Sequence, residues 1–105
     1  MQSERNARRA RTFIQAEFRA GKLRGKGKIR NVGEGGLFLE TASLPPQGEQ
    51  ARIRFTAPTG PIVVSGLVWW TTDRRRARNV GFGFRLLETN RDFDSMVRGL
   101  LRQPR

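Results

Sequence analysis

Hydrophobic and polar residues alternate along much of the chain with a period of two, which is typical of half-buried strands. In residues 12–19, for example, Ile14, Ala16 and Phe18 alternate with polar side chains. The same alternation, or a short β-branched apolar run, recurs further along the chain between turn-forming residues. The pattern predicts six strands, near residues 12–19, 25–32, 37–40, 51–55, 62–70 and 80–86.

Glycine and proline separate the predicted strands. Residues 20–22, 33–36, 44–48 and 58–61 are rich in residues that adopt positive φ or lack a backbone donor, and they predict turns or loops. Residues 73–79 (DRRRARN) predict a charged, solvated loop, although its arginines also suit an acidic surface or nucleic acid.

The C-terminal segment changes to a helical period. An apolar stripe at i, i+3, i+4, i+7 and i+8 predicts an amphipathic helix that begins after a capping Asn90 and ends at Pro104. The stripe comprises Phe93, Met96, Val97, Leu100 and Leu101. We expect it to pack on the core, with a dimer or partner interface as the alternative. The predicted fold class is therefore mainly β: a six-stranded antiparallel β-barrel with a C-terminal amphipathic helix.

Trp69 and Trp70 are adjacent in the fifth predicted strand. Successive side chains of a strand point to opposite faces, so we expect one of them in the core and the other exposed or under the helix. An exposed tryptophan would hint at a partner site.

The composition limits the classes of function. At 105 residues the chain has room for one domain, and it contains no cysteine and no histidine. Thiol nucleophiles, thiolate zinc sites and the most common proton-transfer side chain are thereby excluded, and the carboxylates show no paired arrangement. No apolar run is long enough for a membrane span. We expect a cytoplasmic protein that is not an enzyme, needs no cofactor and does not insert into membranes.

The net charge of +12 is unevenly distributed. Residues 1–30 carry ten Lys and Arg against two acids, residues 71–105 carry nine against four, and residues 31–70 are close to neutral. This excess favours phosphate ligands, nucleic acid or acidic proteins. No continuous cationic sheet face is expected, because the basic residues gather in the N-terminal arm and one loop, so nucleic acid is the less favoured partner.

Two motifs carry the candidate chemistry. Arg5 and Arg9 have the spacing R-x-x-x-R ahead of the first strand, and Asn31-x-Gly33-x-x-Gly36 covers the turn after the second strand. In this order, before a barrel pattern, they resemble the PilZ domain, whose signature is R-x-x-x-R followed by [D/N]-x-S-x-x-G. The stretches RNVGEGGLFLE, SGLVWW and GFGFRLLE are similar to the PilZ variety that is numerous in myxobacteria and their relatives.

The resemblance implies a barrel with a C-terminal helix that binds the bacterial second messenger cyclic di-GMP, with the two arginines wrapping over it as the arm orders. It divides the chain into a flexible basic arm (residues 1–11) and a barrel with its helix (residues 12–105). The ligand-binding residues it implies, together with a neighbouring arginine, are Arg5, Arg8, Arg9, Asn31, Gly33 and Gly36.

The chemistry of these residues agrees with that ligand. The planar fork of arginine holds a phosphate or the O6/N7 edge of guanine bidentately, and it also stacks on a base. Asn31 offers both donors and an acceptor, and the glycines let backbone N–H groups approach an anion. The chain has Gly33 where the family pattern has serine, and the loss of one such hydrogen bond weakens binding by about 0.5–1.5 kcal/mol.

The leading hypothesis is a cyclic di-GMP receptor or adaptor whose ordered arm alters contacts with a protein partner in motility, polarity or matrix regulation. The first alternative is a degenerate PilZ adaptor that acts through protein contacts without the nucleotide. The second is a basic small barrel that binds nucleic acid, with strand aromatics as stacking platforms. In the plainest interpretation, the arginine arm is merely solvated and residues 31–36 are only a tight hairpin.

Overall fold

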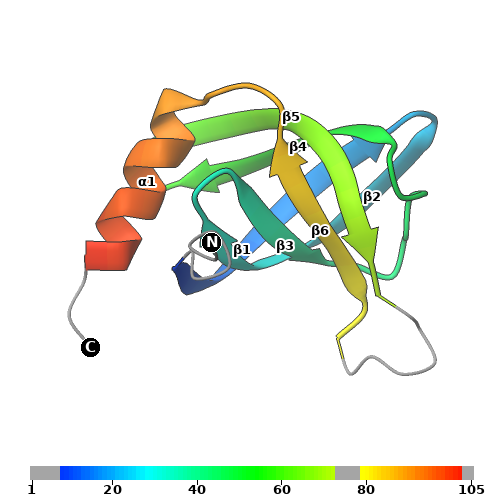
Figure 1. Ribbon diagram of the computed structural model, residues 1–105, viewed down its shortest axis with the longest axis horizontal. Coiled ribbons are helices and arrows are strands. Elements are labelled where there is room, and N and C mark those ends of the chain that lie inside the picture. The colour runs from blue at the N-terminus through cyan, green and yellow to red at the C-terminus, as the bar shows by residue number, and fades with distance from the viewer. Residues whose placement is uncertain (1–7, 73–78, 103–105) are drawn as a thin grey trace, which may run out of the picture.

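The computed structural model describes residues 8–72 and 79–102, and shows a closed barrel of six antiparallel strands with one helix (Figure 1). Around the barrel the strand order is β1-β2-β3-β6-β5-β4. The elements are β1 (Arg9–Ala20), β2 (Leu23–Gly33), β3 (Gly36–Glu40), β4 (Gln50–Ala57), β5 (Gly60–Thr71), β6 (Gly81–Leu86) and α1 (Arg91–Arg102). The predicted fold class is confirmed.

All six strands form where the alternation predicted them, and most extend further by one to three residues. The largest extension at a strand start is in β1, which begins at Arg9 and so includes Arg9–Arg11 from the predicted arm. Gly21 and Gly35 have φ of 60° and 78°, as their tight turns require. Residues 73–78 of the predicted charged loop and the predicted helix end at Pro104 lie outside the described residues.

The core forms from the inward side chains of every strand. Phe82 and Phe84 of β6 point inward and are buried, while the glycines at 81 and 83 occupy the alternate positions. Phe82 packs edge-to-face against Phe18 of β1, with ring centroids 5.2 Å apart. β4 and β5, which connect β1 to β6 around the barrel, add buried side chains at alternate positions. The barrel is therefore filled by side chains.

Helix α1 lies across one end of the barrel (Figure 1). Asn90 caps it, because its Oδ1 accepts a hydrogen bond of 2.8 Å from the Phe93 backbone N–H. Phe93 and Val97 are fully buried, and the rest of the stripe packs partly buried against the core. The predictions of the cap and of a core-packing stripe are confirmed. Among the described residues, no helix has the length and apolar character that crossing a membrane requires.

The prediction that one of Trp69 and Trp70 lies in the core was wrong. Both side chains are exposed, by 50% and 46%. Val68 pairs with Phe84 and Trp70 pairs with the next residue, Gly83, so Trp69 is an extra residue in β5. This β-bulge shifts the alternation by one residue and turns Trp70 outward.

Cationic side chains also form a sheet face that we did not expect. Arg19 on β1 lies opposite Arg24 on β2 and opposite Arg52 on β4. The expectation failed because it counted charges segment by segment along the chain. Strand pairing brings β1 and β2 from the basic first third beside β4 from the nearly neutral middle.

We expect Phe93→Ala to lower the free energy of unfolding by about 3–5 kcal/mol, because it empties a fully buried site between α1 and the barrel. Urea unfolding followed by far-UV circular dichroism measures the loss. The control is Phe13→Ala: Phe13 is 66% exposed and its ring contacts Lys28 and Arg30 by cation–π interactions, so we expect a loss of at most about 1 kcal/mol. Equal losses in the two variants would show that α1 is not anchored through Phe93.

Candidate ligand-binding site

Arg9 and Asn31 form the centre of the candidate site. Arg9 opens β1 opposite Gly33 of β2, and Asn31 lies two residues earlier on β2. Arg9 donates two hydrogen bonds to Asn31 Oδ1, from Nε at 3.0 Å and from Nη2 at 2.6 Å. Partial desolvation lowers the pKa of Arg9, but an arginine side chain stays charged in proteins. The cation is thus held in place beside the β2–β3 turn.

Gly33 leaves the space that Arg9 fills. A Cβ atom at position 33 would lie 2.9 Å from Arg9 Cδ and 3.0 Å from the Arg8 carbonyl oxygen. Any side chain at this position would therefore push against the guanidinium arm. The family pattern has serine at position 33. The glycine found here is what allows the Arg9 side chain to lie where it does.

Gly36 serves the pairing of β3 with β6. Gly33 and Gly36 pair across the hairpin, with Glu34 and Gly35 in the turn. A Cβ atom at position 36 would lie 2.6 Å from the carbonyl oxygen of Phe84, which is backbone and cannot move aside cheaply. The turn is also tied to β6, because the Gly35 carbonyl accepts a hydrogen bond of 2.8 Å from the Leu86 N–H.

Aromatic and cationic side chains continue the site across the outer surface of β3, β6 and β5. Phe38 stacks on Trp70 with ring centroids 5.5 Å apart and planes 23° apart. The indole of Trp70 lies over Gly83, where a Cβ atom would clash with it. The guanidinium of Arg85 lies 4.6 Å from the ring centroid of Trp69.

We name this surface the arginine–tryptophan face. It comprises Arg9, Asn31, Gly33, Gly36, Phe38, Trp69, Trp70, Gly83 and Arg85. Arg9, Gly33, Gly36 and Arg85 form one cross-strand row that spans three strand spacings, or about 15 Å. Asn31, Phe38, Gly83 and Trp70 form the parallel row beside it.

The sequence-predicted site residues divide into two groups. Arg9, Asn31, Gly33 and Gly36 come together on this face. Arg8 points elsewhere: its Nη2 donates a 2.6 Å hydrogen bond to the Leu101 carbonyl at the C-terminal end of α1. Arg5 lies outside the described residues.

Sequence reasoning did not assign Phe38 and Arg85 to the site. One signal was available for Phe38 but not for Arg85: glycines at alternate positions of β6 imply that bulky neighbours cover its outer side. Two rings cover it: the indole of Trp70 lies over Gly83, and a Cβ atom at Gly81 would lie 2.8 Å from the ring of Phe38.

The face combines guanidinium groups, flat aromatic surfaces and an amide side chain. Such a set binds planar, negatively charged ligands, since arginine recognises phosphates and base edges and aromatic rings stack on bases. Among the described residues, no group of three or more acidic side chains gathers as a metal site. The fold is a small closed β-barrel that carries this face on its outer surface.

Comparison with known proteins gives the family. The profile of the PilZ domain matches residues 3–103, nearly the whole chain, so the protein belongs to the PilZ domain family. The resemblance seen in the two motifs is thereby confirmed. No significant match was found among curated proteins.

Solved structures with the same fold include three PilZ-related proteins. Bacillus subtilis MotI/DgrA, an inhibitor of motility, has a TM-score of 0.73 and 13% identity over 90% of this chain and 48% of that one. The PilZ domain of Escherichia coli YcgR with c-di-GMP has a TM-score of 0.71 and 12% identity over 91% and 90%. The PilZ domain of CeSA from a cellulose-synthesizing bacterium has a TM-score of 0.64 and 13% identity over 90% and 96%. The TM-scores show a shared fold, and at such low identities they show the fold alone. The chain spans about half the length of MotI/DgrA.

We expect Gly36→Ala to lower the free energy of unfolding by about 1–3 kcal/mol, because the methyl group meets the Phe84 carbonyl and forces β3 away from β6. Gly99→Ala is the matched control. Position 99 lies in α1 with no atom near its Cβ, so alanine there stabilises the helix by up to about 1 kcal/mol. Thermal and urea unfolding distinguish the two variants. If Gly36→Ala left the free energy of unfolding unchanged, strand packing would not explain this glycine, and a direct contact with a ligand would explain it instead.

Proposed function

We propose that this protein is a cyclic di-GMP receptor, and that the arginine–tryptophan face is its binding surface. The observation that carries the proposal is the doubly hydrogen-bonded Arg9–Asn31 pair beside the glycine hairpin. These residues stand at the positions of the two PilZ motifs. YcgR, a PilZ domain of the same fold, has c-di-GMP in its structure.

Each group on the face has a role in this proposal. Arg9 turns its fork from Asn31 to a phosphate or to the Hoogsteen edge of a guanine, because a charged acceptor binds a guanidinium more strongly than a neutral amide does. Asn31 then offers its amide to the same guanine. The stacked pair of Phe38 and Trp70 gives the purine an aromatic surface at the adjacent strand.

The N-terminal residues take part through Arg8. Its side chain donates a hydrogen bond of 2.6 Å to the Leu101 carbonyl at the C-terminal end of α1. Recruitment of Arg5 and Arg8 to the nucleotide would release that contact and change the surface between the arm and the helix. We propose that this change alters contacts with a protein partner in the cytoplasm, without catalysis. The motility-inhibiting function named for MotI/DgrA supports a partner in motility control.

Isothermal titration calorimetry with cyclic di-GMP tests the proposal directly. We expect saturable binding by the wild type, and an increase in Kd of about tenfold to a hundredfold in Arg9→Ala, because a hydrogen bond to a charged group is lost. Arg98→Ala is the control, since it removes the same charge from an exposed site on α1. Absence of heat with the wild type, or equal binding by all three proteins, would overturn the proposal.

A second candidate is a PilZ adaptor that does not bind the nucleotide. The observation in its favour is that Arg9 fills the space above Gly33 and already has an acceptor in Asn31. Gly33→Ser distinguishes the two candidates in the same titration. For a receptor, the added hydroxyl changes the affinity by no more than about tenfold. A silent wild type together with a binding serine variant would establish the adaptor.

A further inference from the structure

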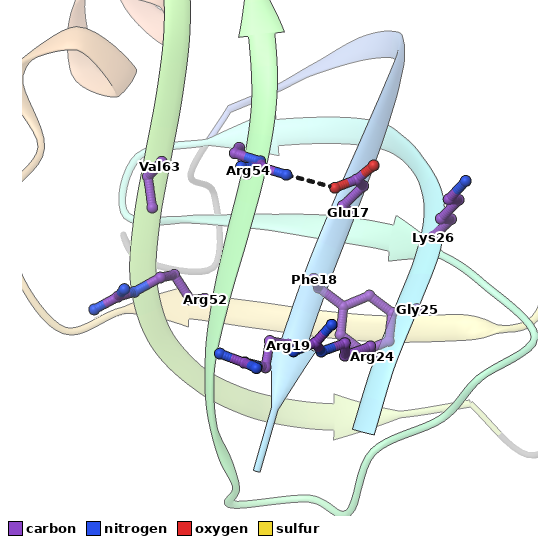
Figure 2. Close-up of a pocket in the computed structure, with 9 residues that line it drawn as sticks. All are labelled: Glu17, Phe18, Arg19, Arg24, Gly25, Lys26, Arg52, Arg54 and Val63. Atoms are coloured by element: carbon purple, nitrogen blue, oxygen red, sulfur yellow. Dashed lines mark hydrogen bonds and ion pairs between the residues drawn. The ribbon is translucent and has the colours of Figure 1, made fainter. Parts of the chain in front are cut away.

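A second basic surface lies at the other end of the β1–β2 ribbon. An open groove of about 570 Å³ runs over the outer side of β2, β1, β4 and β5. Figure 2 shows its lining: Glu17, Phe18, Arg19, Arg24, Gly25, Lys26, Arg52, Arg54 and Val63. Arg9 stands at the opposite end of β1, so this groove is separate from the arginine–tryptophan face.

The charges of the groove form two cross-strand rows. Lys26, Glu17 and Arg54 form one row, and Arg24, Arg19 and Arg52 form the other. In the first row Arg54 donates a 2.7 Å hydrogen bond to Glu17, the only acid among the described lining residues. That hydrogen bond and the charges of Arg54 and Lys26 lower the pKa of Glu17. The Glu17 carboxylate is thus paired with cations of its own row.

The second row has no such compensation. Arg19 faces Arg24 on one neighbouring strand and Arg52 on the other, and like charges directly opposite each other destabilise a sheet. In the part of the chain that the structure describes, none of the three has an acidic partner. Three arginines placed side by side without acidic partners do not stabilise the sheet. Such locally unfavourable arrangements are typical of functional sites.

We propose that this groove binds an acidic segment of a partner protein in extended conformation. The two rows lie two residues apart along the strands, about 7 Å, which is also the spacing of alternate side chains in an extended chain. One carboxylate of the segment would therefore bind the row of Arg24, Arg19 and Arg52. A carboxylate two positions away would bind Lys26 in the other row. The guanidinium forks of the arginines suit carboxylates bidentately. This inference goes beyond the nucleotide site and does not depend on it.

The lining favours a peptide over nucleic acid. Phe18 is the aromatic residue among the described lining residues, and it is buried, so the groove has no exposed ring on which a base can stack. Glu17 in the middle of the groove repels a continuous phosphodiester backbone. Val63 is 44% exposed beside the cations and offers a contact for an apolar side chain of the segment.

Fluorescence anisotropy with a labelled peptide tests the proposal. The probe has alternating Glu and Ser residues around one Leu, and a peptide with Gln in place of Glu is its neutral partner. We expect the wild type to bind the acidic probe and not the neutral one. Binding weakens by about tenfold or more in Arg19→Glu with Arg52→Glu, because two attractive charges become repulsive.

The matched control is Arg91→Glu with Arg98→Glu, which makes the same change in net charge on exposed sites of α1. We expect it to change binding less than threefold. Equal weakening in both double variants would show that net charge alone attracts the probe and would overturn the proposal. Circular dichroism verifies folding, and Arg19→Gln with Arg52→Gln replaces the reversal if that variant does not fold.

Two further probes compete with the peptide. Tighter, Arg19-dependent binding of a labelled single-stranded oligonucleotide, or of vesicles containing anionic phospholipid, would also overturn the proposal. Calorimetry with cyclic di-GMP on the same Arg19→Glu, Arg52→Glu protein keeps the two sites distinct. Loss of peptide binding with unchanged nucleotide titration supports the groove, whatever the wild-type affinity for the nucleotide is.

Discussion

The insertion of β6 between β3 and β5 is the constraint on which the structure depends, because it closes the barrel. Its alternation of glycine and phenylalanine fits two surfaces at once. The phenylalanines fill the core, and the glycines let backbone and indole approach from outside. Gly81 and Gly83 would each place a Cβ atom within 3 Å of a neighbouring strand or of Trp70. The six residues of β6 therefore contribute to both the core and the arginine–tryptophan face.

The sequence was sufficient for the elements of this fold, since period-two alternation and turn residues predict each strand and the 3.6 period predicts the helix. It was insufficient at the irregularities. The bulge at Trp69 reverses the orientation of Trp70, and the local sequence pattern does not predict this bulge. The register of the strands depends on pairing between segments that are distant in the sequence. A residue-by-residue pattern therefore could not predict the contact of Phe38 with Trp70 or the row of Arg24, Arg19 and Arg52.

The candidate site shows the same division. The family motifs led to Arg9, Asn31, Gly33 and Gly36, and the structure brings these residues together. It adds physical reasons that the motifs do not contain: Gly36 permits the close approach of β3 to β6, and Gly33 leaves room for Arg9. Arg8 has the same side chain as Arg9 and directly precedes β1, but it binds the carbonyl of Leu101 at the end of α1.

The outward turn of both tryptophans has a consequence for spectroscopy. The chain contains two tryptophans and no tyrosine, and both indoles lie on the arginine–tryptophan face, outside the core. Ultraviolet emission from the native protein therefore reports the polarity and quenching at that surface, beneath Arg85 and beside Phe38. Unfolding removes the contacts with Arg85 and Phe38 from indoles that are already half-exposed, so the emission change on unfolding also originates at this face. Intrinsic tryptophan fluorescence therefore reports directly on molecules that bind to this face.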